Sequence, residues 1–238
     1  LHDALPISMA SSRHLQRVRQ LELKNFDTTP NSLYSFLSKQ KNFVLEKIAL
    51  KFFLGNETAK AIAKARTFYR LRKIDLTGCF IKDQGVYDLI TSNNLLHVQE
   101  INLTRNKLTS RSLAYLTCSR WKNLKRLILN SNTFKEEHGR DYFKHFFHSK
   151  AVSNLEVLKL ANCRLKNEHL ACLISSPYLR NLCHLAIELN EINNTALDDW
   201  GEFSKFTKLE LLNLEANEIT HDIEESIYSA LSGITVIL

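Results

Sequence analysis

The sequence predicts an α/β solenoid, an arc with a parallel β-sheet on its concave face and α-helices on its convex face. A phrase of the form L-x-x-L-x-L-x-x-N-x-φ, in which φ is apolar, recurs in six full copies. The copies begin 26 to 31 residues apart, at Leu71, Val98, Leu124, Leu155, Leu182 and Leu209. The x-L-x-L-x segment alternates like a strand with one buried face, and the residues after it have helical spacing. One strand and one helix cannot bury their apolar faces alone, so neighbouring units are expected to stack.

The first eight residues, LHDALPIS, resemble a translated sequencing adapter, and we exclude residues 1–8 from the fold. Met9 is the only methionine, and we expect the natural chain to begin there. Residues 9–238 are then expected to form one domain of about eight units, because the repeat continues without interruption. The last residues, GITVIL, begin a further strand, so we expect the C-terminal end to be truncated.

Two degenerate units precede the six copies, over residues 15–42 and 45–68. Phe26 and Phe53 stand where the later copies have Asn or Cys, and we expect these units to cap the solenoid. The second unit is predicted to contain a helix over residues 58–68 with lysines on its outer face. The apolar residues of the first unit are assigned to a strand and a helix face: Val18, Leu21, Leu23, Leu33, Phe36 and Leu37.

Apolar residues at helical spacing follow four of the later strands: Val86, Leu89 and Ile90; Leu113 and Leu116; Leu170, Leu173 and Ile174; Ile223, Ile227 and Leu231. The unit that begins at Leu124 is four or five residues longer than its neighbours, with the extra residues within 135–150. We expect a longer convex helix there, with Phe143, Phe146 and Phe147 on its inner face. A protruding patch for a partner is the alternative.

The Asn or Cys that follows each strand is predicted to have a structural role. At this point the chain turns away from the sheet and leaves backbone N–H and C=O groups without partners. A buried amide side chain bonds to both kinds of group, and stacked copies form a ladder along the arc. The predicted ladder residues are Cys79, Asn106, Asn132, Cys163, Asn190 and Asn217.

The repeated phrase resembles the signature of the leucine-rich repeat family, L-x-x-L-x-L-x-x-N/C-x-L, position by position. Repeats of this length with a full helix are similar to the ribonuclease-inhibitor or RanGAP-like subclass. Relatives with this repeat include GTPase-regulating proteins, sensor arms of immune receptors and bacterial effectors. A RanGAP-like activity needs a specific catalytic Arg and Asn, for which this sequence offers no assignable positions.

Residues that flank the two inner leucines of each strand are expected to point out of the concave sheet. Four lysines form a basic cluster at one end of this face: Lys24, Lys47, Lys51 and Lys73. An apolar patch is expected at the other end: Val157, Ala161, Ala186 and Leu211. Exposed apolar residues rimmed by charge are typical of a protein interface, and a neutral surface without a partner is the alternative. The predicted partner-binding residues are Lys47, Lys51, Lys73, Arg126, Ile128, Val157, Lys159, His184, Glu188, Leu211 and Glu215.

Charge is distributed unevenly along the chain. Residues 9–75 carry 14 Lys/Arg and 5 Asp/Glu, residues 76–154 carry 12 and 6, and residues 155–238 carry 6 and 13. An arc with a basic end and an acidic end would orient a charged partner or steer its approach. The alternative is a solvated surface that meets no partner.

The composition is ordinary for a globular protein, no apolar run is long enough to span a membrane, and no charged-then-apolar N-terminal segment looks like a signal peptide. The five cysteines include no CxxC pair, which favours reduced thiols and a cytoplasmic, intracellular setting. A secreted effector is the alternative localisation. We expect neither a cofactor nor a membrane partner.

Two groups of residues were weighed as metal sites, and structural roles are favoured for both. His145 and His148 are three apart on the predicted helix, but no carboxylate or cysteine at ligand spacing completes a site. The second group falls at different structural positions of adjacent repeats: Cys163, His169, Cys172, Cys183 and His184.

The leading functional hypothesis is a non-catalytic protein–protein interaction module or scaffold that binds a protein in its concave face. An enzyme is disfavoured because the sequence has no glycine-rich phosphate loop, G-x-S-x-G elbow or HExxH motif, and no small-molecule substrate is evident. One alternative is the sensor or targeting arm of a larger regulatory or effector protein. Another is nucleic-acid binding through the basic N-terminal half. It is disfavoured because the lysines are not interleaved with exposed aromatics and the acidic C-terminal third repels phosphates.

Overall fold

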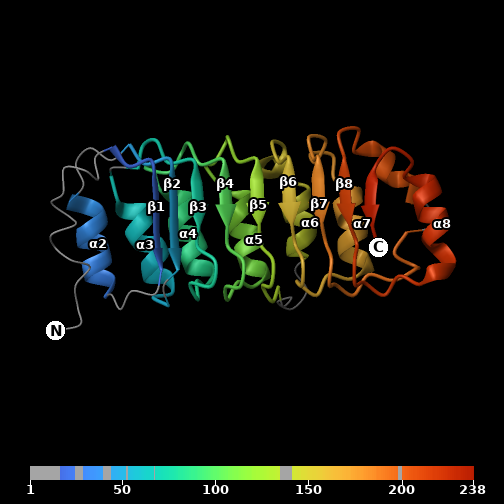
Figure 1. The fold of residues 1–238 in the computed structure, drawn as a ribbon, viewed down its shortest axis with the longest axis horizontal. Coiled ribbons are helices and arrows are strands. Elements are labelled where there is room, and N and C mark those ends of the chain that lie inside the picture. Colours follow the sequence, from blue (N-terminus) through green and yellow to red (C-terminus); the bar gives the residue numbers. More distant parts are fainter. Residues whose placement is uncertain are drawn as a thin grey trace.

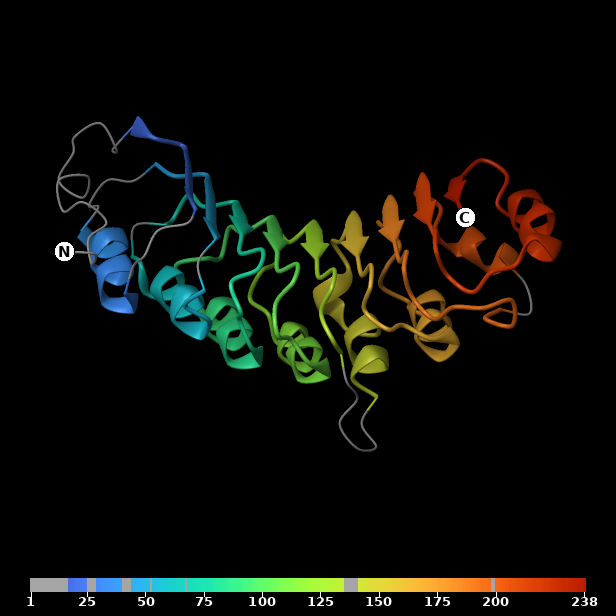
Figure 2. The same cartoon turned by 60° about the horizontal axis from the view of Figure 1, so that its bottom comes forward.

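The computed structural model describes residues 17–24, 29–39, 44–51, 53–66, 68–134, 141–197 and 200–238. Across these ranges the chain forms one parallel sheet whose nine strands lie in chain order. The strands are β1 (Gln20–Lys24), β2 (Lys47–Lys51), β3 (Lys73–Asp75), β4 (Glu100–Asn102), β5 (Arg126–Ile128), β6 (Val157–Lys159), β7 (His184–Ala186), β8 (Leu211–Asn213) and β9 (Thr235–Ile237). Figure 1 shows this sheet running along the long axis of the molecule. In Figure 2 the strands line the inner side of an arc and the helices its outer side, which confirms the predicted α/β solenoid.

The sequence repeat sets the register between strands. Ile101 lies directly beside Leu127 of the next strand, and Leu127 lies beside Leu158. The equivalent central residues of six strands form a continuous buried row, each with at most 1% of its surface exposed: Ile74, Ile101, Leu127, Leu158, Leu185 and Leu212. Because side chains alternate between the two faces of a strand, the residues on either side of this row point to the concave face.

A layer of helices and short 3-10 turns covers the outer face of the sheet. Its elements are α2 (Pro30–Lys39), α3 (Asn56–Lys64), α4 (Asp83–Thr91), α5 (Ser110–Thr117), α6 (Tyr142–Phe147), η2 (Lys150–Val152), α7 (Asn167–Ile174), η3 (Trp200–Lys205) and α8 (His221–Ala230). The predicted inner faces are confirmed where the helices are regular, and Val86, Leu89 and Ile90 of α4 are fully buried. Between β7 and β8 the 3-10 helix η3 takes the place of an α-helix, with Trp200 stacked on Phe203 at 6.1 Å between ring centroids.

The long unit does not contain the longer helix that its sequence predicts. Helix α6 has only six residues, because Ser149 starts the separate turn η2 by accepting the N–H of Ala151 at 3.2 Å. The aromatic inner face of α6 is confirmed, since Phe143, Phe146 and Phe147 are each at most 2% exposed. Of the extra residues, 135–140 lie outside the described part of the chain.

The second unit departs from its predicted structure at two points. Helix α3 begins at Asn56 and ends at Lys64 rather than spanning 58–68, because Gly55 turns into it at φ 60° and Ala65 is extended. Phe53 stands at the ladder position of the sequence, but its side chain does not enter the ladder, since 80% of its surface is exposed. Phe26, its counterpart in the first unit, lies outside the described residues. The first unit does bury five of its predicted apolar residues: Leu21, Leu23, Leu33, Phe36 and Leu37.

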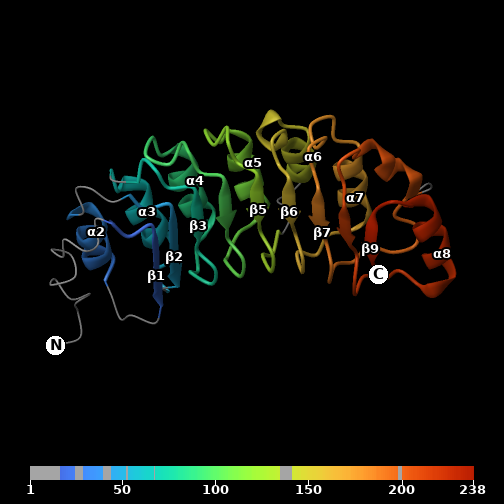
Figure 3. The ribbon, with the colours of Figure 1, turned by 45° about the horizontal axis from the view of Figure 1, so that its top comes forward.

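The C-terminal residues form strand β9 as predicted, and Val236 pairs with Leu212 of β8. Helix α8 packs on this end of the arc through Ile227, which is fully buried, while Tyr228 of the same helix is 48% exposed. Figure 3 shows α8 and β9 together at the end of the molecule opposite α2. None of the helices described is both long enough and apolar enough to cross a membrane.

Candidate interaction surface

The asparagines at the predicted ladder positions bond to the backbone of two consecutive units. Asn132 is 1% exposed, and its Nδ2 donates to Leu103 O of the preceding unit at 2.9 Å and to Leu129 O of its own unit at 2.8 Å. Its Oδ1 accepts the N–H of Leu108 in the preceding unit at 3.3 Å. Asn106, Asn190 and Asn217 make the same set of bonds, so these side chains tie the units together beneath the concave sheet.

The two ladder cysteines also contact backbone carbonyls. The Sγ of Cys79 lies 2.9 Å from Leu50 O, and the Sγ of Cys163 lies 3.4 Å from Leu129 O. Burial raises the pKa of the Cys163 thiol to about 12, because the thiolate would lose its hydration. A buried thiol in this state is a poor nucleophile, so Cys163 serves the structure.

A second polar ladder, which the sequence interpretation missed, runs along the turns that lead into the convex helices. Asn56 Oδ1 accepts the N–H of Lys82 in the next unit at 2.8 Å, and Asn167 Oδ1 accepts the N–H of Asn193 at 3.1 Å. Thr109 donates its N–H to Asp83 Oδ1 at 2.9 Å in the same way. The signal was present in the sequence as a polar residue three or four positions after each ladder residue.

The concave face is built from side chains that lie in register on neighbouring strands. In the row formed by the first residue of each strand, Lys73 lies beside Glu100, and Glu100 lies beside Arg126. The Oε2 of Glu100 is 3.0 Å from Lys73 Nζ and 3.3 Å from Arg126 Nε, so one carboxylate bridges two cations across three strands. Half of the Lys73 side chain and 42% of the Arg126 side chain remain exposed.

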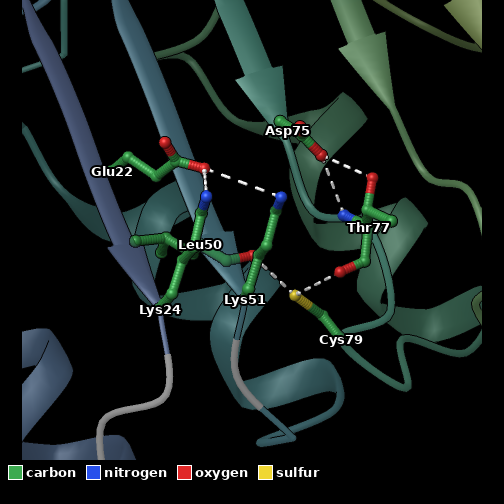
Figure 4. A network of polar contacts seen from close by, with 7 residues as sticks. All are labelled: Glu22, Lys24, Leu50, Lys51, Asp75, Thr77 and Cys79. Carbon is green, nitrogen blue, oxygen red and sulfur yellow. Dashed lines mark hydrogen bonds and ion pairs between the residues drawn. The ribbon is translucent and has the colours of Figure 1, made fainter.

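The basic cluster at the first two strands also contains a carboxylate. Glu22 of β1 lies 2.9 Å from Lys24 Nζ and 3.6 Å from Lys51 Nζ, as Figure 4 shows. The hydrogen bond and charge of Lys24 hold the pKa of the Glu22 carboxyl below its usual value, with a smaller contribution from Lys51. Farther along, Asp75 Oδ1 accepts both the N–H and the hydroxyl of Thr77, which fixes the turn at the end of β3. The carboxylate of Glu22 therefore neutralises part of the positive charge at this end of the sheet.

The apolar patch predicted at the other end is not exposed, and this prediction was wrong. Val157, Ala161 and Ala186 have only 3%, 6% and 7% of their surface accessible. Val157 lies in register between Arg126 and His184. Because strands are about 4.8 Å apart, a short side chain between two long ones is shielded by them. Leu211, the fourth residue of the predicted patch, and Ile128, another predicted apolar residue, are only partly exposed on the concave face.

The acidic end of the concave face lies over β7 and β8. Glu188 and Glu215 follow these strands, and Glu188 is half-buried while Glu215 is exposed. The Oε2 atom of Glu188 is shielded from solvent and has no hydrogen-bond partner among the described residues. His184 Nε2 lies 3.5 Å from Oε2 of Glu210, the residue before β8, and Lys159 of β6 is half-buried. The structure thus separates a basic end from an acidic end, as the charge distribution predicts.

The histidines considered as metal ligands bond to the protein itself. His145 Nδ1 lies 2.6 Å from Asp141 O, and His148 Nε2 lies 3.2 Å from Ser175 Oγ. Nowhere in the described ranges do three His, Cys, Asp or Glu side chains gather in a way that could hold a metal ion.

Comparisons with known proteins find similarity in structure and not in sequence. No protein-family model matches the chain, and the search of curated proteins finds no match. The structure of a TLR13–ssRNA13 complex matches with a TM-score of 0.63 and 23% identity, over 95% of this chain and 30% of that one. A protein from Bacteroides fragilis matches with a TM-score of 0.66 and 12% identity, over 96% and 68% of the two chains. An internalin from Listeria monocytogenes matches with a TM-score of 0.56 and 17% identity, over 94% and 68%.

These identities are low, so the likeness concerns the fold alone, and this chain spans less than a third of the length of the TLR13 chain. The three matched proteins are leucine-rich-repeat proteins. Together with the strand register and the buried asparagine ladder, the matches show that this chain has the leucine-rich-repeat fold.

Proposed function

We propose that this chain is a non-catalytic interaction module that binds a protein partner on its concave face. The observation that supports this role most directly is the separation of charge along one continuous, solvent-facing sheet. Exposed Lys47 and Lys73 lie at one end, exposed Glu215 lies at the other beside Leu211 of β8, and Arg126 of β5 lies between these ends. A partner with the complementary order of charges would bind in one orientation only, because the reverse orientation juxtaposes like charges.

The concave face is also prepared for binding. The ion pairs that Glu100 makes with Lys73 and Arg126 hold these long side chains in place before a partner arrives. Ordering a rotamer-rich side chain on binding costs about 0.5–1.5 kcal/mol, and a side chain that is already held avoids part of that cost. Arg is enriched among residues that dominate binding energy, and we place Arg126 at the centre of the interface.

The titratable groups of the described residues also favour binding over catalysis. Several concave charges are paired with opposite charges, as Lys73 and Arg126 are with Glu100 and Lys24 and Lys51 are with Glu22. Burial raises the pKa of both the Cys163 and the Cys172 thiols, and nearby Asp141 adds to the effect at Cys172. A raised thiol pKa lowers the fraction of reactive thiolate, which is the opposite of what a catalytic cysteine needs.

A second candidate is the sensor or targeting arm of a larger protein. It is favoured by coverage, since this chain matches only 30% of the TLR13 chain and 68% of the internalin and of the Bacteroides fragilis protein. The five cysteines are all free, which supports an intracellular location for either role. Under this second proposal the concave face selects the partner and a separate domain acts on it.

The test compares two variants that carry the same change in charge. The concave variant combines Lys47→Glu, Arg126→Glu and Leu211→Glu, and the convex control combines Lys64→Glu, Arg111→Glu and Ala171→Glu. All six residues are at least partly exposed, so both proteins should retain the circular dichroism and melting temperature of the unsubstituted chain. Each protein is used to capture partners from cell extract, and the bound proteins are quantified by mass spectrometry.

We expect proteins captured by the unsubstituted chain to be retained by the convex control and reduced at least tenfold by the concave variant. Equal capture by the two variants would place the interface elsewhere and would contradict the proposal.

A further inference from the structure

Two exposed aromatic rings lie together where strands β2 and β3 end. Phe53 is 80% exposed and Phe80 is 46% exposed, and their ring centroids are 5.2 Å apart in an edge-to-face arrangement. Lys107 of the next unit places its Nζ 5.4 Å from the centroid of the Phe80 ring. A phenylalanine stabilises the fold mainly when its ring is buried, and these two rings are largely exposed, so neither contributes much to the core. The pair therefore presents apolar faces beside a cation at the rim of the sheet.

The backbone at Phe80 adds to the cost of this arrangement. Phe80 has a φ of 59°, a left-handed conformation that is unfavourable for a bulky residue other than glycine. Arg164, which follows the other ladder cysteine, has a φ of 58°, so this conformation belongs to the turn after a ladder cysteine, and at Phe80 it fixes where the ring emerges at the rim.

The opposite rim, where strands β2 and β3 begin, carries a similar pair. Tyr69 is 53% exposed, and the guanidinium of Arg70 lies 5.6 Å from the centroid of its ring. These two residues line a surface cavity of about 450 Å³ together with Arg72 and His97. Both rims of the basic end therefore present an aromatic ring with a cation beside it.

Strand β2 connects the two rims with lysines at both of its ends, Lys47 and Lys51, and Lys73 lies beside Lys47 in register. Carboxylates also border this path: Glu22 pairs with Lys51, and Glu46 lines the cavity by Tyr69. The five residues of β2 extend about 16 Å at 3.3 Å per residue, a length that accommodates a short run of nucleotides.

We propose that this path, from Tyr69 along β2 to Phe53 and Phe80, binds single-stranded nucleic acid. Single strands are bound by cations that follow the phosphates and by aromatic rings on which bases stack, and the path contains both. The sequence disfavours nucleic acid on two grounds, and the exposed rings of Phe53, Phe80 and Tyr69 beside the lysines remove the first. The second ground, the acidic C-terminal third, concerns residues at the other end of the concave face, over β7 and β8. A lipid bilayer fits less well, because a bilayer is flat, whereas Lys47, Lys51 and Lys73 belong to strands β2 and β3, and the strands line the inner side of the arc (Figure 2). The path shares Lys47 and Lys73 with the protein-binding face proposed above, but Phe53, Phe80 and Tyr69 are not part of that face, so substitutions of these rings test the present proposal separately.

The test measures fluorescence anisotropy of a 5′-fluorescein-labelled U12 oligonucleotide titrated with the full chain. We expect binding that weakens as sodium chloride rises from 50 to 300 mM, because bound phosphates release counterions. Phe53→Ala and Tyr69→Ala are each expected to weaken binding about tenfold, the effect of losing one stacking ring. Phe53→Trp is expected to retain it. Phe53 and Tyr69 are more than half exposed, so melting curves should be unchanged.

Tyr228→Ala is the matched control, because Tyr228 is a similarly exposed aromatic residue on α8 at the acidic end. It should leave the affinity for U12 unchanged. The proposal is overturned if the unsubstituted chain fails to bind U12, or if the ring substitutions have no effect. It is also overturned if a twelve-residue polyglutamate peptide, or vesicles of phosphatidylserine, bind more tightly and lose binding with the same substitutions.

Discussion

The ladder position holds either asparagine or cysteine, and we call each of these side chains a rung. The two kinds of rung bond to the preceding unit differently. Asn132 donates to Leu103 O and accepts from Leu108 N–H of that unit. Cys163 places its Sγ near Leu129 O, but a thiol is a weak donor and a weak acceptor and has no counterpart to the amide oxygen. An asparagine at the ladder position therefore bonds to both a backbone carbonyl and a backbone N–H of the preceding unit. A cysteine there contacts only a carbonyl.

The backbone after the rung differs as well. After Asn106 the N–H of Lys107 donates to Ile81 O of the preceding unit at 2.8 Å, which extends the parallel pairing beyond the strand. After the two cysteines, Phe80 and Arg164 take left-handed φ values of 59° and 58°. The backbone conformation directly after the ladder residue therefore differs between cysteine and asparagine positions.

The location of the cysteines explains why two kinds of rung coexist. Cys79 follows the unit in which Phe53 is exposed and not inserted at the ladder position. Cys163 follows the long unit, whose extra residues come directly after Phe134. An amide oxygen stabilises the fold only where the preceding unit offers an N–H at the right place. In both cases a cysteine at the ladder position follows a unit whose turn is irregular.

The largest effect is expected for Asn132→Ala. This change removes a buried amide that satisfies two carbonyls and one N–H, and we expect the free energy of unfolding to fall by about 3 kcal/mol. Cys163→Ala removes one weak donor and should cost about 1 kcal/mol. Urea denaturation followed by circular dichroism measures both changes. Equal losses in the free energy of unfolding would show that asparagine and cysteine stabilise the ladder equally.

Exchanging the rung types sharpens the comparison. We expect Cys163→Asn to destabilise the chain by about 1–2 kcal/mol, because the new amide oxygen is buried after an irregular unit and lacks an N–H partner. The reverse change, Asn132→Cys, keeps a donor and should cost less than Asn132→Ala. Stabilisation by Cys163→Asn, in the same urea assay, would mean that the preceding turn does offer an N–H.

The cysteine rung should also make stability depend on alkaline pH. The Cys163 pKa is raised from 9.0 to about 12 in the folded chain, so between these values the unfolded thiol ionises and the folded one does not. Its contribution is complete below pH 9 and falls by about 1.4 kcal/mol per pH unit above it. The free energy of unfolding of the unsubstituted chain should therefore decrease more steeply from pH 9 to 10.5 than that of Cys163→Ala. Parallel curves would contradict burial of this thiol.

The smallest effect is expected at the residue after the rung. Arg164→Gly relieves a left-handed conformation, and we expect a gain of about 0.5 kcal/mol after the entropy of the unfolded glycine is subtracted. Lys107→Gly, at the equivalent position after Asn106, has no such conformation to relieve and should lose a similar amount. A loss in both variants would show that φ at Arg164 is not a source of strain.

Much of the fold was predictable because the period of the pattern determines which residues face inward. The rows of Ile101 and Leu127 follow directly from the alternation of x-L-x, and the unit spacing places them side by side. The path of a turn is not contained in this period. Phe53 occupies the correct position in the sequence for a rung, yet its turn takes another course and leaves it exposed.

The sequence predicts which side chains point to the concave face, but not how much of each side chain is exposed. Val157 points to the concave side as expected, but its exposure depends on Arg126 and His184, which belong to units roughly thirty residues away in sequence. The second polar ladder was missed for a related reason. Asn56 and Asn167 are typical helix-start residues, and their bonds to the following unit appear only once the units are stacked.

The asparagine ladder has a direction, and that direction matters during synthesis. Asn132 bonds to Leu103 O and to the N–H of Leu108, two residues that leave the ribosome earlier. The polar groups of one turn are therefore satisfied by an asparagine of the following unit. Each newly emerged unit therefore keeps open polar groups until the next unit has been translated. The growing chain carries its least stable unit at the end nearest the ribosome, and every added unit moves that vulnerable position forward by one repeat.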